Sequence, residues 1–290
     1  MTVWNLGSIN ADHFYRLPHL PQPGETLAAA DYAVGLGGKG ANQSVALARA
    51  GADVRHIGAV AADGLWMVAR MRAAGVDCTH VAVLPGASGH AIIEVDAAGE
   101  NAILLFAGTN RAIAPDAVRA VLSGAAPGDW LVTQNETSAL SEAVAEARAR
   151  GLRVAYSAAP FDAAAVRAVL PGVTLLIVNE GEAEALRRDF GGAPPVPQMV
   201  VTLGAQGAEW HENGQVIRVP AFRVRSVDTT GAGDTFAGYL LAGLAQGFSP
   251  REALRLASGA AALKVTRTGT ADAIPARDEV DAFLAAQPSE

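Results

Sequence analysis

Residues 130–157 read WLVTQNETSALSEAVAEARARGLRVAYS and hold the alternation that decides the fold. The apolar runs at 130–134 and 153–156 are typical of short buried strands, and the segment at 141–150 between them predicts a helix. The rhythm continues with a predicted helix at 162–170 and a predicted strand at 174–178. Regular alternation of this kind places helices on both faces of a mostly parallel sheet. We therefore predict a doubly wound α/β fold.

The N-terminal part of the chain shows the same rhythm. It predicts a strand at 3–9, a helix at 42–51 that ends at a glycine, and a strand at 54–60. A further helix is predicted to begin at Pro115. The alternation therefore extends over most of the sequence.

Two stretches break this alternation, because the strand-like residues at 27–34 and 89–106 have no helix after them. The second stretch carries the turn D96-A-A-G-E100 between apolar runs, which is typical of a hairpin. We expect a small sheet built from about residues 11–36 and 88–107. The sequence leaves two roles open for it: a lid over a ligand site, or an extension of the edge of the main sheet.

The second half of the chain carries three further local signals. The Asn-Gly pair inside H211-E-N-G-Q215 predicts a hairpin turn, and S249-P-R-E252 predicts a capped helix that runs to about Lys264. A last helix is expected after Pro275. No internal repeat or low-complexity linker divides the sequence, so we predict a single domain over residues 1–290.

Composition argues against several classes of protein. The 290 residues carry a formal net charge of −7 without a compensating Lys/Arg block, which disfavours a nucleic-acid partner. Cys78 is the only cysteine, so an internal disulfide and a CxxC pair are excluded. The sequence shows no signal-peptide pattern, and no apolar run reaches the roughly 18 residues of a membrane span. We expect a soluble cytoplasmic protein with no membrane partner.

The segment D228-T-T-G-A-G-D234 lies between a strand-like run at 222–227 and an apolar helix predicted at 235–246. Its glycines bring backbone N–H groups close to a ligand, and the helix N-terminus favours an anion at the same point. Asp234 in the first helical turn can accept a proton from an alcohol. Phosphoryl transfer needs this combination, because its loose transition state depends on positioning and charge stabilisation. The alternative is that Asp234 only stabilises the helix dipole.

A second glycine cluster, G35-L-G-G-K-G-A-N42, also precedes a predicted helix. It is not a P-loop, because Gly40 follows Lys39 where that motif requires Ser or Thr. Its glycines match the G-x-G-x-x-G fingerprint, with Asp63 about 20 residues further on, so a dinucleotide-binding fold is a competing interpretation. The charged donor at Lys39 and the amide at Asn42 are atypical of that fingerprint.

Polar residues also follow three predicted strands. Asn10 and Asp12 come after the first strand, Q134-N-E136 after the strand at 130–134, and N179-E-G-E182 after the strand at 174–178. Ligands of open α/β sheets bind outside the carboxyl ends of the strands. Asn10 and Asp12 are therefore placed to hydrogen-bond a polar, uncharged substrate, although both residue types also form loops.

Taken together, these residues make the chain similar to the ribokinase-like carbohydrate kinases, the phosphofructokinase-B family, over nearly its whole length. The two glycine-rich signatures in this order are highly specific for the family. The resemblance is carried by GSINADH at 7–13, PGET at 23–26, GGKGANQ at 37–43, NEGEAE at 179–184, TLGAQG at 202–207, DTTGAGDTF at 228–236 and VTRTG at 265–269.

The resemblance implies roles for individual residues. Asp234 is the implied catalytic base, and N–H groups for the transferring phosphoryl come from Gly231, Ala232 and Gly233. The implied sugar ligands are Asn10, Asp12, Gly38, Lys39, Asn42 and Glu136. The implied ATP contacts are Asn179, Thr202 and Gly204, and Glu182 matches the magnesium motif, directly or through water.

A monovalent cation, potassium, is also implied beside the anion site. The matching positions, several of which contribute only backbone carbonyls, are Asp228, Thr230, Lys264, Arg267 and Gly269. Ala273 stands where these kinases often have a serine, which removes one oxygen ligand. A second departure is the segment GGAPPVP at 191–197, which is too short for the helix that the family places before the strand of TLGAQG. Residues 182–189 are expected to supply that helix alone.

The implied activity is ATP-dependent transfer of the γ-phosphoryl group to the primary hydroxyl of D-ribose. Within the family, the alternatives are a nucleoside kinase and a kinase of another sugar. Outside it, they are an NAD(P)-dependent oxidoreductase, suggested by residues 35–40, and a non-catalytic sugar-binding regulator. The expected partners are the sugar, ATP and, through pairing of lid strands, a second copy of the chain.

Overall fold

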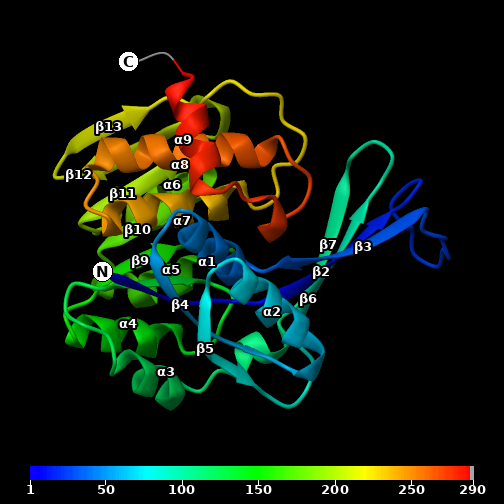
Figure 1. The fold of residues 1–290 in the computed structure, drawn as a ribbon, viewed down its shortest axis with the longest axis horizontal. Helices are drawn as coiled ribbons and strands as arrows, with labels where there is room; N and C mark the ends of the chain where they lie inside the picture. The colour runs from blue at the N-terminus through cyan, green and yellow to red at the C-terminus, as the bar shows by residue number, and fades with distance from the viewer. Residues whose placement is uncertain (288–290) are drawn as a thin grey trace.

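The computed structural model describes residues 1–287 and contains two β-sheets (Figure 1). Among these residues the larger sheet has nine strands, in the order β13-β12-β11-β10-β9-β8-β1-β4-β5. The strands that pair in parallel are β1 (Thr2–Leu6), β4 (Asp53–Val60), β5 (Asp77–Val83), β8 (Trp130–Gln134), β9 (Arg153–Ser157), β10 (Leu175–Asn179) and β11 (Gln198–Thr202). The antiparallel hairpin of β12 (Ala208–Glu212) and β13 (Gln215–Val219) extends one edge.

Helices cover both faces of this sheet, which confirms the predicted doubly wound fold. One face carries α1 (Lys39–Arg49), α2 (Leu65–Ala73), α7 (Ala232–Ala245), α8 (Pro250–Val265) and α9 (Arg277–Ala285), and the other carries α3 (Pro115–Leu122), α4 (Leu140–Ala149), α5 (Ala163–Val169) and α6 (Glu180–Phe190). Along β1, Val3 belongs to one buried cluster and Trp4 and Leu6 to the other, because successive strand residues face opposite ways. Within residues 1–287, none of these helices combines the length and apolar character that a bilayer crossing requires.

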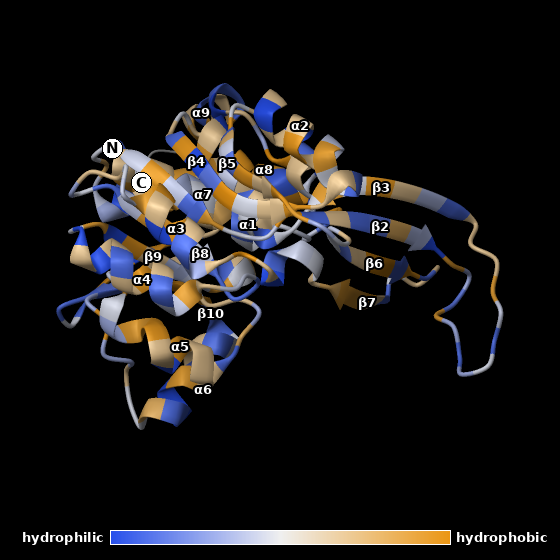
Figure 2. Ribbon diagram, turned by 90° about the horizontal axis from the view of Figure 1, so that it is seen from below, coloured by the Kyte–Doolittle hydropathy of each residue, from blue (hydrophilic) through white to orange (hydrophobic). Residues whose placement is uncertain are grey.

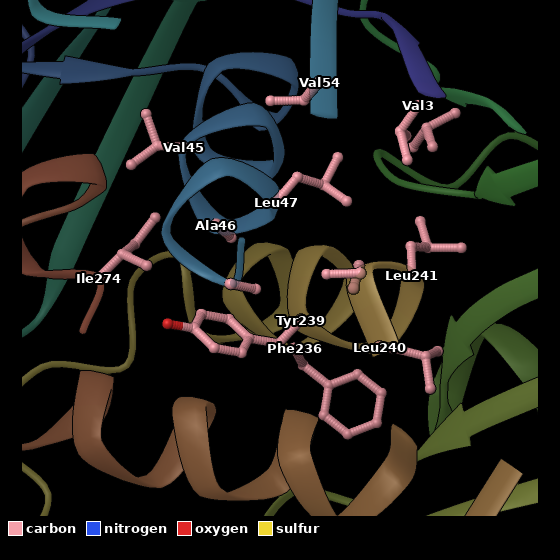
Figure 3. Close-up of a cluster of buried hydrophobic side chains, with 14 of the residues drawn as sticks. Val3, Val45, Ala46, Leu47, Val54, Phe236, Tyr239, Leu240, Leu241 and Ile274 are labelled. Carbon is pink, nitrogen blue, oxygen red and sulfur yellow. The ribbon is translucent and has the colours of Figure 1, made fainter. Parts of the chain in front are cut away.

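α1 and α7 cross in close contact at Gly238. Figure 3 shows Ala46 and Leu47 of α1 and Leu241 of α7 within one buried cluster. At Gly238, a Cβ atom would lie 2.4 Å from the Cβ of Ala46 and 2.9 Å from the Gln43 carbonyl oxygen. Only glycine fits this position, so the two helices that carry the glycine-rich signatures are held against each other.

The remaining four strands form a separate sheet in the order β3-β2-β6-β7. They are β2 (Asn10–Arg16), β3 (Asp31–Gly37), β6 (Gly89–Val95) and β7 (Asn101–Phe106). Figure 2 shows this small sheet projecting from the layered body, with the loop between β2 and β3 beyond it. The interpretation as an edge extension of the main sheet is wrong, because the two sheets are distinct among the described residues. The role of the small sheet as a lid stays a prediction.

Three predicted strand positions differ from the structure. The first strand ends at Leu6, because residues 7–9 lead the chain out of the main sheet and into β2. β3 begins at Asp31, so the first residues of the predicted strand at 27–34 are loop. The predicted strand at 222–227 is wrong. The amides of Val227 and Asp228 donate to the Val265 carbonyl at 2.7 and 3.1 Å, so the end of this segment is attached to the end of α8 instead of a strand.

The local signals in the second half of the chain are confirmed. Asn213 and Gly214 adopt φ values of 49° and 75° in the β12–β13 hairpin. Ser249 and Glu252 form a reciprocal capping box at the start of α8. α6 ends at Phe190, and residues 191–197 connect it to β11 without a further helix, as the short segment predicts.

Replacing Gly238 by alanine tests the close crossing. The added methyl group would overlap Ala46, so we expect the unfolding free energy to fall by about 1–3 kcal/mol in urea denaturation. The control is Gly181→Ala in α6, where a Cβ would meet only Asn179 Oδ1 at 3.5 Å and alanine should stabilise the helix by up to about 1 kcal/mol. Equal unfolding free energies for the two variants would contradict the contact.

Candidate active site

The candidate site lies where the main sheet, the small sheet and the start of α1 meet. A Cβ at Gly40 would lie 2.3 Å from the Cα of Gly7, so the end of β1 and the start of α1 touch through their backbones. The Ala41 amide donates to the Ser8 carbonyl at 2.8 Å and fixes this approach. At Gly38, a Cβ would lie 2.9 Å from the Asn10 amide nitrogen. The glycines therefore bring the start of β2 and the start of α1 together.

Asp234 lies in the first turn of α7, directly after the turn at Gly231, whose φ is 74°. It is 9% exposed. Its Oδ2 accepts a hydrogen bond from Asn42 Nδ2 at 3.0 Å, and its Oδ1 accepts one from Gln43 Nε2 at 3.1 Å. A residue that only stabilised the helix dipole would need neither burial nor these partners. Because a carboxylate oxygen can accept more than one hydrogen bond, Asp234 keeps capacity for a substrate hydroxyl.

Sequence reasoning did not assign Gln43, although it belongs to the quoted GGKGANQ motif. Gln43 is fully buried, and its Oε1 accepts a hydrogen bond from Gln134 Nε2 at 2.7 Å. Gln134 also donates to Asn5 Oδ1 at 3.0 Å. Connected, buried amides of this kind fix one another's orientation. The available signal was a second amide side chain directly after Asn42. Its consequence is that the Asp234 carboxylate is held by a side chain that is itself fixed by Gln134.

The side chains predicted to bind the sugar gather around Asp234. Asn10 is 3% exposed, and its Oδ1 accepts a hydrogen bond from Asn110 Nδ2 at 2.8 Å. Glu136 accepts hydrogen bonds from the Ser8 hydroxyl and, at 3.2 Å, from the Lys39 amide. Within the described residues, no group donates to the buried Oδ1 of Asn42. Sequence reasoning assigned neither Ser8 nor Asn110, which orient the assigned residues.

The charges in this cluster are coupled. The Asp234 carboxylate raises the pKa of Lys39, against the opposing effect of burial, and Glu136, Glu182 and Asp12 raise it further. Burial raises the pKa of Asp12 to about 7, and the charges of Glu136 and Asp234 contribute. Burial also raises the pKa of Glu136. Near neutral pH, Asp12 therefore exists in both protonation states and can accept a hydrogen bond from a sugar hydroxyl or donate one to it.

A cavity of about 510 Å³ lies on the other side of the 228–234 segment. Thr202 and Gly204, which the resemblance assigns to the nucleotide, line it together with Ala232 and Gly233 of the glycine-rich turn, and we therefore call it the nucleotide-side cavity. Phe236 gives it an apolar wall, and the buried hydroxyl of Ser258 has no hydrogen-bond partner among the described residues. The cavity suits a flat, largely apolar ligand with an anionic group at the Gly233 end.

Asn179 and Glu182 form a capping box at the start of α6. Asn179 Oδ1 accepts a hydrogen bond from the Glu182 amide at 2.9 Å, and Glu182 Oε2 accepts one from the Asn179 amide at 2.8 Å. Asn179 is not among the residues that line the nucleotide-side cavity. Burial raises the pKa of Glu182. Residues 1–287 contain no cluster of three or more histidine, cysteine, aspartate and glutamate side chains able to hold a metal. One half-buried carboxylate suits Mg²⁺ that keeps its waters, as Mg²⁺ with a nucleotide commonly does.

The residues that the resemblance assigns to potassium also lie close together. The Asp228 carboxylate accepts hydrogen bonds from the Thr230 and Gly269 amides, both at 2.9 Å. Burial acts to raise the pKa of Asp228, but these hydrogen bonds and the Lys264 charge outweigh it and lower the pKa. The Arg267 side chain points elsewhere, to Glu279 of α9, at 2.6 Å.

The dinucleotide-binding interpretation is wrong. Gly35 and Gly37 lie on β3 of the small sheet, whereas that fingerprint requires a strand of the main sheet before its helix. Asp63 accepts hydrogen bonds from the amide and the hydroxyl of Ser88 at 3.1 and 2.6 Å. Its carboxylate therefore stabilises the turn before β6, whereas the fingerprint would require it to bind a ribose hydroxyl.

The site combines a buried carboxylate at a helix N-terminus with polar residues on one side and an apolar cavity on the other. This arrangement suits a small-molecule phosphotransferase. The pfkB family carbohydrate kinase model matches residues 3–277, and the chain belongs to this family. It is an ATP-dependent sugar kinase.

Three relatives illustrate the range of the family. The chain is 35% identical to a ribokinase of Haemophilus influenzae over 98% of both chains. The structure of an Arabidopsis thaliana ribokinase complexed with ribose and ATP is 26% identical, with a TM-score of 0.83 and 98% of both chains covered. A Burkholderia thailandensis nucleoside kinase in complex with inosine is also 26% identical, with a TM-score of 0.85 over 98% of this chain and 96% of that one.

The raised pKa of Asp12 predicts a pH-dependent stability difference between the wild type and Asp12→Asn. The folded state binds the Asp12 proton more tightly than the unfolded chain does, because the pKa rises from 3.8 to about 7 on folding. The contribution of this proton to the unfolding free energy is complete below pH 3.8 and is lost as the pH rises through about 7. We expect the unfolding free energy of the variant, relative to the wild type, to rise by about 2 kcal/mol or more between pH 4 and pH 8.

Urea unfolding at both pH values measures this difference. The control is Asp31→Asn, at an exposed position of the same small sheet. A wild-type-minus-variant difference that is the same at both pH values would show that Asp12 ionises like an ordinary surface carboxylate.

Proposed function

We propose that this kinase transfers the γ-phosphoryl group of ATP to the primary hydroxyl of D-ribose and releases ribose 5-phosphate and ADP. The observation that carries the proposal is the position of Asp234. Its carboxylate is held by Asn42 and Gln43 from α1, while the preceding residue, Gly233, lines the nucleotide-side cavity. One helical turn therefore borders both proposed substrate sites.

In the proposed reaction, the primary oxygen of ribose attacks the γ-phosphorus, and the bond from that phosphorus to the β–γ bridging oxygen breaks. Asp234 accepts the hydroxyl proton, and ADP leaves with the bonding electron pair. Charge on the transferring group is stabilised by the N-terminus of α7, and the proposed donors are the amides of Gly231, Ala232 and Gly233. Of these, the Ala232 amide donates to the Thr229 carbonyl at 3.1 Å in the structure and would have to turn from it to the phosphoryl group. Binding and orientation thus supply most of the catalysis that phosphoryl transfer requires.

The sugar site is proposed to consist of Asn10, Asp12, Gly38, Lys39, Asn42 and Glu136. Its buried donors and acceptors suit a polyol, because each buried polar group left unmatched would cost about 1–3 kcal/mol. The free Oδ1 of Asn42 is one such acceptor among the described residues. On the nucleotide side, the proposal assigns Thr202 and Gly204 to the nucleoside and Asn179 to the phosphates.

Glu182 is proposed to hold, through water, the Mg²⁺ that accompanies ATP, and this ion would neutralise charge on the phosphate oxygens. Activation by potassium stays a prediction from the resemblance, and the position of Lys264 bears directly on it. Because ATP is the proposed donor, a cytoplasmic location is part of the proposal.

A nucleoside kinase is the second candidate, and one feature favours it. A further cavity of about 550 Å³ borders Glu136 and is lined by Asn135, Phe161 and Leu105 of β7. It offers space next to the proposed sugar site for a base attached to the sugar. Direct measurement of ADP release with pentoses, hexoses and nucleosides distinguishes the candidates: we expect D-ribose to give the highest kcat/KM, and a higher value for a nucleoside would replace ribose in the proposal.

The base role of Asp234 predicts the effect of Asp234→Asn. We expect kcat to fall by about 10²–10⁴-fold, because an amide cannot accept the hydroxyl proton, while ribose binding measured by calorimetry persists. The matched control is Asp116→Asn, which changes an exposed acid in the first turn of α3. Unchanged turnover in Asp234→Asn would remove Asp234 as the base.

The proposed homodimer predicts a role for the exposed apolar residues of the small sheet. Leu104 and Ile103 of β7 are 67% and 60% exposed, and Tyr32 of β3 is 50% exposed. We expect the wild type to sediment as a dimer and Leu104→Glu as a monomer, because the substitution places a charge in the interface. The control is Val216→Glu on β13, which is 53% exposed in the other sheet. A monomeric wild type would contradict the proposal.

A further inference from the structure

Lys264 places a buried positive charge beside the 228–234 segment. It lies in the last turn of α8, and its side chain is 0% exposed. Its Nζ donates a hydrogen bond to the Asp228 carbonyl oxygen at 3.0 Å and lies 3.9 Å from Asp228 Oδ2. A buried ammonium requires such partners, because an unpaired charge is costly inside a protein. The end of α8 also favours a cation, since the helix dipole is negative there.

This ammonium is central to a junction that orders the anion-binding turn. Asp228 is the first residue of the segment that leads to the amides of 231–233, and its carboxylate also accepts the Thr230 and Gly269 amides, both at 2.9 Å. One residue thus joins α8, the glycine-rich turn and the loop at 269. The Lys264 charge is therefore positioned to stabilise the turn on which the transferring phosphoryl depends.

The same residues do not fit the exchangeable monovalent cation that the resemblance implies. The Asp228 carbonyl oxygen is already bound by Nζ, and a second cation at this oxygen would be repelled by the ammonium. The Lys264 carbonyl accepts the Arg267 amide at 3.0 Å. Ala273 supplies no hydroxyl oxygen to complete a coordination shell.

We propose that the Lys264 ammonium is a tethered cation that takes the place of the exchangeable ion, so that this kinase works without potassium. Lys264 is then a positioning residue: it acts through Asp228 on the anion-binding turn and touches neither substrate. This inference rests on the proposed kinase function for its catalytic consequence, and it reverses the expectation of potassium activation.

The first experiment needs no activity. Urea unfolding of the wild-type chain is compared in KCl, NaCl and choline chloride at equal ionic strength. A cation that binds only the native state raises the unfolding midpoint. We expect the wild-type midpoint to be the same in KCl and in NaCl, and the Lys264→Ala midpoint to be higher in KCl, because removal of the side chain opens the Asp228 oxygens to the ion. A potassium-specific rise in the wild-type midpoint would overturn the proposal.

The second experiment measures ribose-dependent ADP release in the same salts, with ADP quantified directly by chromatography because coupling enzymes can themselves respond to potassium. Wild-type rates in the three salts should agree within about twofold, and Lys264→Ala should lose roughly tenfold or more in kcat in choline chloride and recover with KCl. Lys264→Met, which lacks the charge but fills the space, should lose activity without recovering.

Wild-type activation of about fivefold or more by KCl over both other salts would overturn the proposal, as would full activity of Lys264→Ala in choline chloride. If Lys264→Ala does not fold, the wild-type unfolding midpoints and rates in the three salts alone decide whether the kinase works without potassium. If the wild type releases no ribose-dependent ADP in any salt, the proposed D-ribose kinase activity fails, and the unfolding midpoints still decide whether Lys264 excludes an exchangeable ion.

Discussion

The close crossing of α1 and α7 is the constraint on which the site depends. Gly238 allows α7 to approach Ala46 within a distance that any side chain would prevent, and the first turns of the two helices meet as a result. Asn42 and Asp234 are 192 residues apart in sequence, yet they form a hydrogen bond of 3.0 Å. The crossing therefore brings together the N-termini of both helices, each of which carries a partial positive charge. An anionic group that lies against both helix N-termini is stabilised by both partial positive charges.

The acidic side chains of the site lie on the side proposed for the sugar and not in the cavity proposed for the nucleotide. Asp12, Glu136 and Asp234 belong to the proposed sugar side, where they accept hydrogen bonds and are partly balanced by Lys39. Within residues 1–287, the cavity on the nucleotide side instead has no carboxylate in its lining, which consists mostly of small and apolar residues, Arg223 and the turn before α7. A nucleotide triphosphate would be repelled by a pocket of carboxylates, whereas backbone amides and the positive charge of Arg223 attract it. This separation explains how a chain with a net charge of −7 can bind a polyanion.

Most of the fold could be predicted from the sequence, because periodicity and turn chemistry are local properties. The alternation around residues 130–157, the Asn213-Gly214 turn and the capping box at Ser249 each specify structure through neighbouring residues. The 222–227 segment was mispredicted because the amide at its end, that of Val227, bonds to the Val265 carbonyl, a tertiary contact that no local pattern encodes. Gln43 and Lys264 show the same limit at the site. Their residue types are visible in the sequence, but the atoms they contact belong to distant segments.

The small sheet reaches the proposed sugar site through a single strand, β2. β2 begins with Asn10 and Asp12, both buried at the proposed sugar site, and continues through Arg16 into the projecting part of the sheet. Asn10 pairs with Gly37 of β3 on one side and with Gly89 of β6 on the other. The positions of both neighbouring strands therefore depend on the position of Asn10. A sugar that hydrogen-bonds Asn10 and Asp12 would therefore contact the strand through which the small sheet joins the site. If the small sheet is the predicted lid, closure and recognition need no separate signal, because the proposed sugar-binding residues Asn10 and Asp12 are part of that sheet.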